Sequence, residues 1–112
     1  MNPFKILHYQ DESGQDLYQD WLRCLRDQVA KVAIIRRVAR VEVGNFGDHK
    51  FLQSGVSELR VDVGAGYRIY YGQVGDKVIL LTHGGDRSNQ AADIAKAIKL
   101  LDDWKRRNET RS

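Results

Sequence analysis

Arg60 and Arg68 stand on either side of Gly64-Ala65-Gly66, a tight-turn signal in this 112-residue sequence. The segments around them are typical of β-strands, so a hairpin would bring the two guanidinium groups close together on one face. Two guanidiniums in that arrangement are suited to bind a phosphate, because the planar fork of arginine matches the geometry of phosphate oxygens. The alternative is structural, with Arg60 paired to Glu58 or Asp62 on a solvated sheet face. Arg68 would then only hold the hairpin.

Two further cations, Arg87 and Lys50, lie close to glycine residues outside this hairpin. Arg87 follows Gly84-Gly85, where the absence of side chains lets backbone N–H groups approach a phosphate. The equally supported alternative is a loop that only leads into the next helix and caps it with its own polar residues. Lys50 comes just before the predicted sheet, where it would clamp a phosphate or remain an ordinary exposed loop residue. We expect no chemical role for its neighbour His49.

Tyr70 and His83 add an aromatic ring and an acid-base group to the same region. An unpaired RNA base stacks well on an aromatic ring, so Tyr70 is a candidate RNA contact, whereas packing in the core is the usual role of such a ring. His83 titrates near neutral pH and could move a proton, although a structural histidine at a strand end is the more common case. The sequence has no histidine pair at helical spacing and no dense carboxylate cluster, so we expect no metal site and no cofactor.

The elements that must position these residues follow from the spacing of apolar residues. Strict alternation over residues 58–63 predicts a half-buried strand whose core face holds Leu59, Val61 and Val63. Arg60 and the two acids beside it leave that face together. The expected elements are a strand at 4–9, an antiparallel helix pair at 13–25 and 28–43 with a break near 26–27, strands at 58–63, 67–71 and 77–82, and a final helix around 94–104.

The predicted element order is βααβββα, which describes an α+β fold. It consists of a small antiparallel sheet packed with two N-terminal helices and a C-terminal helix, and residues 1–112 are expected to form a single domain. Apolar residues make up 42% and charged residues 29% of the sequence, which is typical of a folded globular protein. The formal net charge of +3 permits an anionic partner without requiring one.

Cysteine content and hydropathy indicate the compartment. Cys24 is the only cysteine, so no intramolecular disulfide can form, and a reducing compartment fits best. The N-terminal residues lack the apolar region of a signal peptide, and no apolar run approaches the ~20 residues of a membrane span. We therefore expect the protein in the cytoplasm.

Three motifs in the second half of the chain resemble a known family. They are the Glu58-Leu59-Arg60 strand, the Gly66-Tyr67-Arg68 hairpin and the Gly84-Gly85-Asp86 loop, preceded by Gly47-Asp48-His49-Lys50. In this order and spacing they resemble the HigB-like addiction-module killer proteins of the RelE/ParE toxin superfamily, and the combination is far more specific than any one short motif. The resemblance implies a RelE-like fold and the toxin of a type II toxin–antitoxin system.

RelE-like toxins cut messenger RNA in the ribosomal A site by driving a ribose 2′-hydroxyl onto the adjacent phosphate, without an obligatory metal. The resemblance therefore implies a ribosome-dependent mRNA endoribonuclease with the catalytic residues Arg60, Arg68 and Arg87. It is also compatible with RNA contacts by Lys50, Tyr70 and His83. RelE relies on a tyrosine in its last helix, and the last helix expected here contains none, so the general base stays unassigned.

The implied partners are a cognate antitoxin with a helix-turn-helix domain, the ribosome with its message, and operator DNA reached only through the antitoxin complex. Two alternatives stay open: a ParE-like poison of DNA gyrase without nuclease activity, and a catalytically inactive nucleic-acid-binding module. ParE-like chains do not usually carry the Gly-Gly-Asp loop, which favours the nuclease. The second expected helix has a basic face, either solvated or resting on ribosomal RNA, formed by Lys31, Arg36, Arg37 and Arg40.

Overall fold

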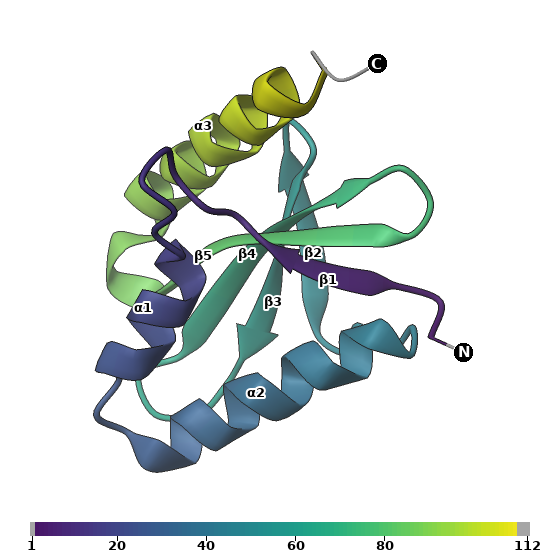
Figure 1. The fold of residues 1–112 in the computed structure, drawn as a ribbon. Helices are drawn as coiled ribbons and strands as arrows, with labels where there is room; N and C mark the ends of the chain where they lie inside the picture. Colours follow the sequence, from purple (N-terminus) through teal and green to yellow (C-terminus); the bar gives the residue numbers. More distant parts are fainter. Residues whose placement is uncertain (1, 110–112) are drawn as a thin grey trace.

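The computed structural model describes residues 2–109, which form a five-stranded sheet and three α-helices (Figure 1). In chain order the elements are β1 (Lys5–His8), α1 (Leu17–Cys24), α2 (Gln28–Glu42), β2 (His49–Gln53), β3 (Val56–Val61), β4 (Tyr67–Val74), β5 (Val78–Asp86), a single 3₁₀ turn (Arg87–Asn89) and α3 (Gln90–Glu109). Within the described range, none of the helices has the length and apolar character needed to cross a membrane.

The sheet has the strand order β1-β5-β4-β3-β2. Strands β2 to β5 pair antiparallel as a meander, whereas β1 pairs parallel to β5. The α+β class is confirmed, but the sheet is mixed, because the partner of the first strand is set by the path of the whole chain and not by its local pattern. The prediction also missed β2, because this edge strand is exposed except for half-buried Leu52 and so lacks the alternating pattern of a core strand.

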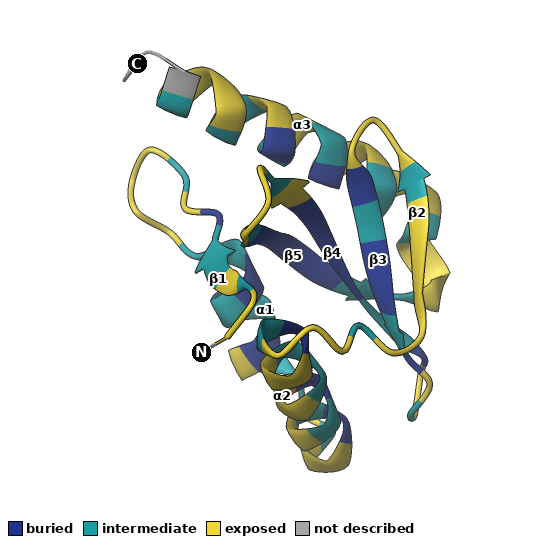
Figure 2. Cartoon of the chain, turned by 90° about the vertical axis from the view of Figure 1, so that its right-hand side faces the viewer, coloured by how far each residue is buried: buried dark blue, intermediate teal, exposed yellow. Residues whose placement is uncertain are grey.

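Helices cover both faces of the sheet. On one face, Leu22 of α1 and Ile34 of α2 pack against strand residues such as Leu59. On the other face, Leu101 of α3 packs against Val56 and its neighbours. In Figure 2, β3, β4 and β5 are accordingly mostly buried, while β2 is mostly exposed. The predicted core face of β3 is confirmed at Leu59, but the opposite face is not solvated, because α3 lies over it.

The two N-terminal helices begin at aspartate caps. The Asp16 side chain accepts a backbone hydrogen bond at the start of α1, so this helix begins later than the predicted start at residue 13. Ser13 instead hydrogen-bonds to Asp11 within a turn. The Asp27 side chain caps α2, which confirms the predicted break. The two helices are not the predicted antiparallel pair. In Figure 1, α2 begins beyond the end of α1 and runs away from it in a different direction.

Two adjacent glycines in β5 let helices approach the sheet closely on both sides. A Cβ atom at Gly84 would collide with the Trp21 ring of α1, and a Cβ atom at Gly85 would collide with the Asp93 carboxylate of α3. Successive strand residues point to opposite faces, so each glycine makes room for one helix. The close approach at Gly85 brings the first turns of α3 against the polar residues of β3, β4 and β5.

Candidate functional site

A row of polar side chains crosses four strands on the face that α3 covers. Lys50 of β2 pairs with Glu58 of β3, and Glu58 pairs with Tyr70 of β4. Tyr70 in turn pairs with His83 of β5. Residues paired in this way share one face of a sheet. The candidate residues from β2 to β5 are therefore neighbours in space, although the sequence separates them by more than thirty positions.

Glu58 is the centre of a charged cluster beside this row. Its side chain is only 1% exposed and accepts a hydrogen bond from Arg60 Nε at 2.9 Å, which raises the pKa of Arg60. Arg68 Nη1 lies 3.9 Å from the same carboxylate oxygen, and Gln90 Nε2 donates to the other oxygen at 3.3 Å. Arg60 and Arg68 occupy directly paired positions in the hairpin. The buried carboxylate thus orients Arg60 through a hydrogen bond and lies within ion-pair distance of Arg68.

The three arginines selected from the sequence line one cavity of about 160 Å³. Arg60 and Arg68 reach it from the hairpin, and Arg87 reaches it from the turn after β5. Arg87 occupies the space that the missing side chain of Gly66 leaves, since a Cβ atom there would lie 2.5 Å from Arg87 Nη2. Two carboxylates complete the charged lining: Asp48 lies 3.9 Å from Arg60, and Asp62 lies 3.4 Å from Arg87.

The acids of this arginine cavity differ in how firmly they are held. The side chains of Asp48 and Asp62 are 59% and 88% exposed, and exposed ion pairs contribute little stability. Glu58 is buried, so separating it from its partners is costly. Arg68 Nε is a buried donor without a hydrogen-bond acceptor among the described residues, which is a costly state for a guanidinium. A phosphate would therefore compete with the two exposed acids for Arg60 and Arg87, while Glu58 stays paired with Arg60.

Arg37 of α2 fixes the segment that borders the cavity. Its guanidinium donates to the backbone oxygens of Arg60, Phe46 and Asp48, at 2.5, 2.9 and 2.8 Å. Burial lowers the pKa of Arg37. The expectation of a solvated or RNA-facing role is therefore wrong for this residue. The helical period could have indicated this structural role. Position 37 lies three residues after Ile34, so it points toward the sheet.

Tyr70 and His83 stack beneath α3, with ring centroids 5.2 Å apart. Both are buried, so the structure does not place either ring where an RNA base could reach it. Burial raises the pKa of Tyr70 to about 12 and lowers the pKa of His83 to about 4, so both side chains are neutral at pH 7. His83 Nε2 lies 3.6 Å from Asp93, whose own pKa is raised by burial. Lys50 is exposed on β2 and is not among the described residues that line the arginine cavity.

Comparison with known proteins shows a bacterial relative. The sequence matches no family model. It is 43% identical over 84 residues to an uncharacterised protein of Haemophilus influenzae, in an alignment that covers 75% of this chain and 84% of the relative. The chain belongs to the family of that Haemophilus protein. The description of the relative names no activity, so for this family the geometry of the arginine cavity is the basis for a functional argument.

Proposed function

We propose that this chain is the toxin of a type II toxin–antitoxin system, a HigB-like member of the RelE/ParE superfamily that cuts messenger RNA on the ribosome. One observation carries the proposal: three arginines from separate segments line one cavity, and a buried carboxylate orients two of them. Guanidiniums fixed in this way are suited to a phosphate that gains charge during a reaction. The element order and the helices on both faces of the sheet are compatible with a RelE-like topology.

The proposed reaction is an internal transfer at the phosphate. The ribose 2′-oxygen attacks the adjacent phosphorus while its proton passes to a base. The bond between phosphorus and the 5′-oxygen breaks, and the leaving oxygen takes up a proton. The products are a 2′,3′-cyclic phosphate and a 5′-hydroxyl end, and the step needs no metal.

Each charged residue of the arginine cavity has a part in this reaction. Arg60 and Arg68 bind the non-bridging oxygens and stabilise the added charge, and Arg87 approaches from the exposed rim. Glu58 is a positioning residue, because it is buried and acts through the two guanidiniums. Asp48 and Asp62, the exposed carboxylates of the lining, are the candidate proton acceptors. His83 takes no part, because it is buried beneath α3 and is not among the described residues that line the arginine cavity.

The test is cleavage of a reporter message in a translation extract, with 5′ ends mapped by primer extension in the presence and absence of ribosomes. The proposal expects wild-type protein to cut only on ribosomes and folded Arg68→Ala to leave the message intact. Cutting of free RNA would contradict the dependence on ribosomes. Growth arrest without any cut would point to a ParE-like gyrase poison, and neither arrest nor cut to an inactive nucleic-acid-binding module.

The proposal includes a partner and a compartment. A helix-turn-helix antitoxin would neutralise the toxin and bind operator DNA in complex with it, and both would work in the cytoplasm together with the ribosome. Co-expression of the protein encoded beside this gene should restore growth and yield a complex that co-purifies. Continued growth arrest despite equal expression of both proteins would remove that protein as the antitoxin.

A further inference from the structure

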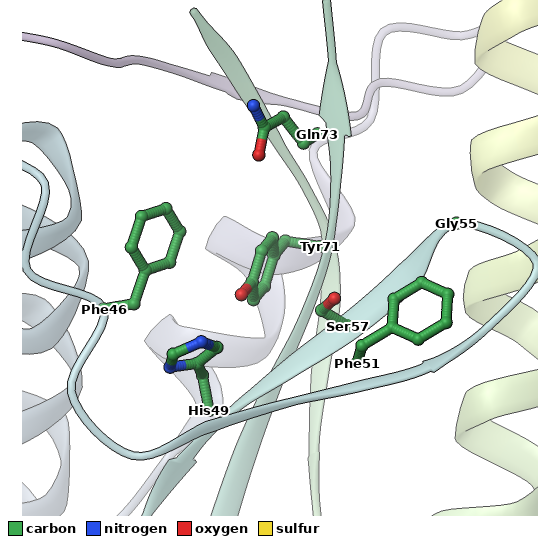
Figure 3. Close-up of a pocket in the computed structure, with 7 residues that line it drawn as sticks. All are labelled: Phe46, His49, Phe51, Gly55, Ser57, Tyr71 and Gln73. Carbon is green, nitrogen blue, oxygen red and sulfur yellow. The ribbon is translucent and has the colours of Figure 1, made fainter. Parts of the chain in front are cut away.

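A second cavity, of about 500 Å³, opens on the other face of β2, β3 and β4 (Figure 3). Ser57 and Tyr71 line it, and they alternate along β3 and β4 with Glu58 and Tyr70 of the arginine face. Because successive strand residues point to opposite faces, the two cavities share strands but no strand side chains. The same hairpin therefore presents a charged surface on one side and a largely aromatic one on the other.

Rings form the walls of this aromatic pocket. Figure 3 shows Phe46 and Phe51 on either side of Tyr71, with His49 beside Phe46. The centroid of Phe46 lies 5.5 Å from that of His49 and 5.9 Å from that of Tyr71, so these three rings form one cluster. Phe51 is 65% exposed, so most of its ring faces open space. A flat apolar group inserted between Phe51 and the cluster would cover this exposed ring.

Polar groups complete the pocket. Ser57 and Gln73 place a hydroxyl and a side-chain amide among the lining residues. Rings that offer their faces, together with hydrogen-bonding groups at the margin, are what proteins use to bind an unpaired nucleobase. Gln73 Nε2 already donates to Gly75 O at 3.2 Å, so a base would meet the Ser57 hydroxyl and the Gln73 amide oxygen.

One short segment of the chain contributes lining residues to both the aromatic pocket and the arginine cavity. Phe46 and His49 line the aromatic pocket, and Asp48, between them in sequence, lines the arginine cavity. Arg37 holds this segment in place through the backbone oxygens of Phe46 and Asp48. An RNA strand that crosses this segment would meet the arginine cavity at Asp48 and the aromatic pocket at Phe46 and His49.

We propose that the aromatic pocket binds one unpaired nucleobase next to the phosphate that is cut, with Phe51 as the stacking side chain. This inference rests on the proposed function and adds the means by which the message is held. One exposed cation, Lys50, lies on the same edge strand between His49 and Phe51, which suits the RNA backbone. The competing occupant is a partner protein that pairs with the free edge of β2 and inserts an apolar side chain.

The test uses purified ribosomes programmed with a short message, either intact or with one abasic nucleotide at a single position near the cut. Wild-type protein is compared with Phe51→Ala and with Val29→Ala, a matched removal of an exposed apolar side chain on α2, where Val29 is 71% exposed. Both side chains are exposed, so both variants should unfold at the wild-type temperature. Steady-state cleavage gives kcat and KM for each combination.

The proposal expects Phe51→Ala to raise KM on the intact message about tenfold with little change in kcat, as loss of one stacked base would do. Val29→Ala should match wild type. When the abasic nucleotide stands at the position that the pocket binds, the KM of wild type should rise by the same factor. The KM of Phe51→Ala should not rise further at that position. An unchanged KM in Phe51→Ala would overturn the base pocket. So would KM increases from the substitution and from the abasic nucleotide that add at every position tested.

Failure of the inference is distinguishable from failure of the proposed function. If wild type cuts the programmed message and Phe51→Ala cuts it equally well, only the base pocket is lost. If Phe51→Ala cuts normally but no longer binds the co-expressed antitoxin, the pocket belongs to the partner protein and the inference is also overturned. If wild type cuts no message at all, the nuclease proposal fails and the base pocket fails with it.

Discussion

The arginine cavity and the aromatic pocket lie on opposite faces of β3 and β4, and they differ in what their side chains already contact. In the arginine cavity each guanidinium has a carboxylate within 4 Å, so the site is neutralised by its own residues. In the aromatic pocket the ring of Phe51 faces mostly open space. The comparison shows that the charged side chains are already paired with one another, whereas the Phe51 ring has few contacts of its own.

The largest expected effect is on the charged face. Arg68→Ala should lower the single-turnover cleavage rate about 10²–10³-fold, as removal of one group that stabilises transition-state charge does in other enzymes. Arg68→Lys keeps the charge but not the planar fork, so it should recover only part of the rate. Phe51→Ala on the aromatic face should change KM instead. A rate loss below tenfold in folded Arg68→Ala would contradict the difference between the faces.

Substitutions of Glu58 test whether its buried carboxylate stabilises the charged face. Glu58→Ala leaves the partly buried guanidinium of Arg68 without its carboxylate, so the free energy of unfolding should fall by about 2–4 kcal/mol. Glu58→Gln keeps the shape and a hydrogen-bond acceptor and should cost less than Glu58→Ala. Urea denaturation measures both. A stability equal to wild type in Glu58→Ala would mean that this carboxylate does not hold the cluster.

His83 gives the charged face a pH signature. Its folded pKa of about 4 lies below the ordinary value of 6.5, so the unfolded chain binds the proton first. Stability should be complete above about pH 6.5 and fall by about 2–3 kcal/mol as the pH drops toward 4. In His83→Gln most of this decline in stability should be absent. Asp93, whose pKa is raised, contributes to the pH dependence with the opposite sign in both proteins. Parallel pH profiles of the two proteins would contradict the burial of a neutral imidazole.

The smallest expected effect concerns the exposed pair of Asp62 and Arg87. Both side chains are mostly in solvent, so Asp62→Asn should leave the unfolding midpoint unchanged within experimental error. The contrast with Glu58→Ala is the point of the experiment, because both acids contact an arginine of the same cavity. A clear loss of stability in Asp62→Asn would show that the exposed pair of Asp62 and Arg87 stabilises the fold as the buried Glu58 cluster does.

The sequence predicts those parts of the site that depend on local pattern. The pairing of Arg60 with Arg68 and the burial of Leu59 follow from strict alternation and a glycine turn, and the start of α2 follows from its aspartate cap. The burial of Glu58 could not be predicted, because it depends on α3 crossing the second face of the sheet. The aromatic pocket was missed because its edge strand, β2, has an exposed pattern that resembles a loop.

The central claim is that the arginine cavity drives a ribose 2′-hydroxyl onto the adjacent phosphate, and the most direct measurement replaces that hydroxyl. A message is prepared with one 2′-deoxynucleotide on the 5′ side of the mapped cut, and a control message carries the deoxynucleotide on the 3′ side. The account predicts that wild-type protein on ribosomes leaves the first message intact at that position and cuts the control, with 5′-hydroxyl ends on the fragments. Equal cutting of both messages, or fragments with 5′-phosphate ends, would contradict the account.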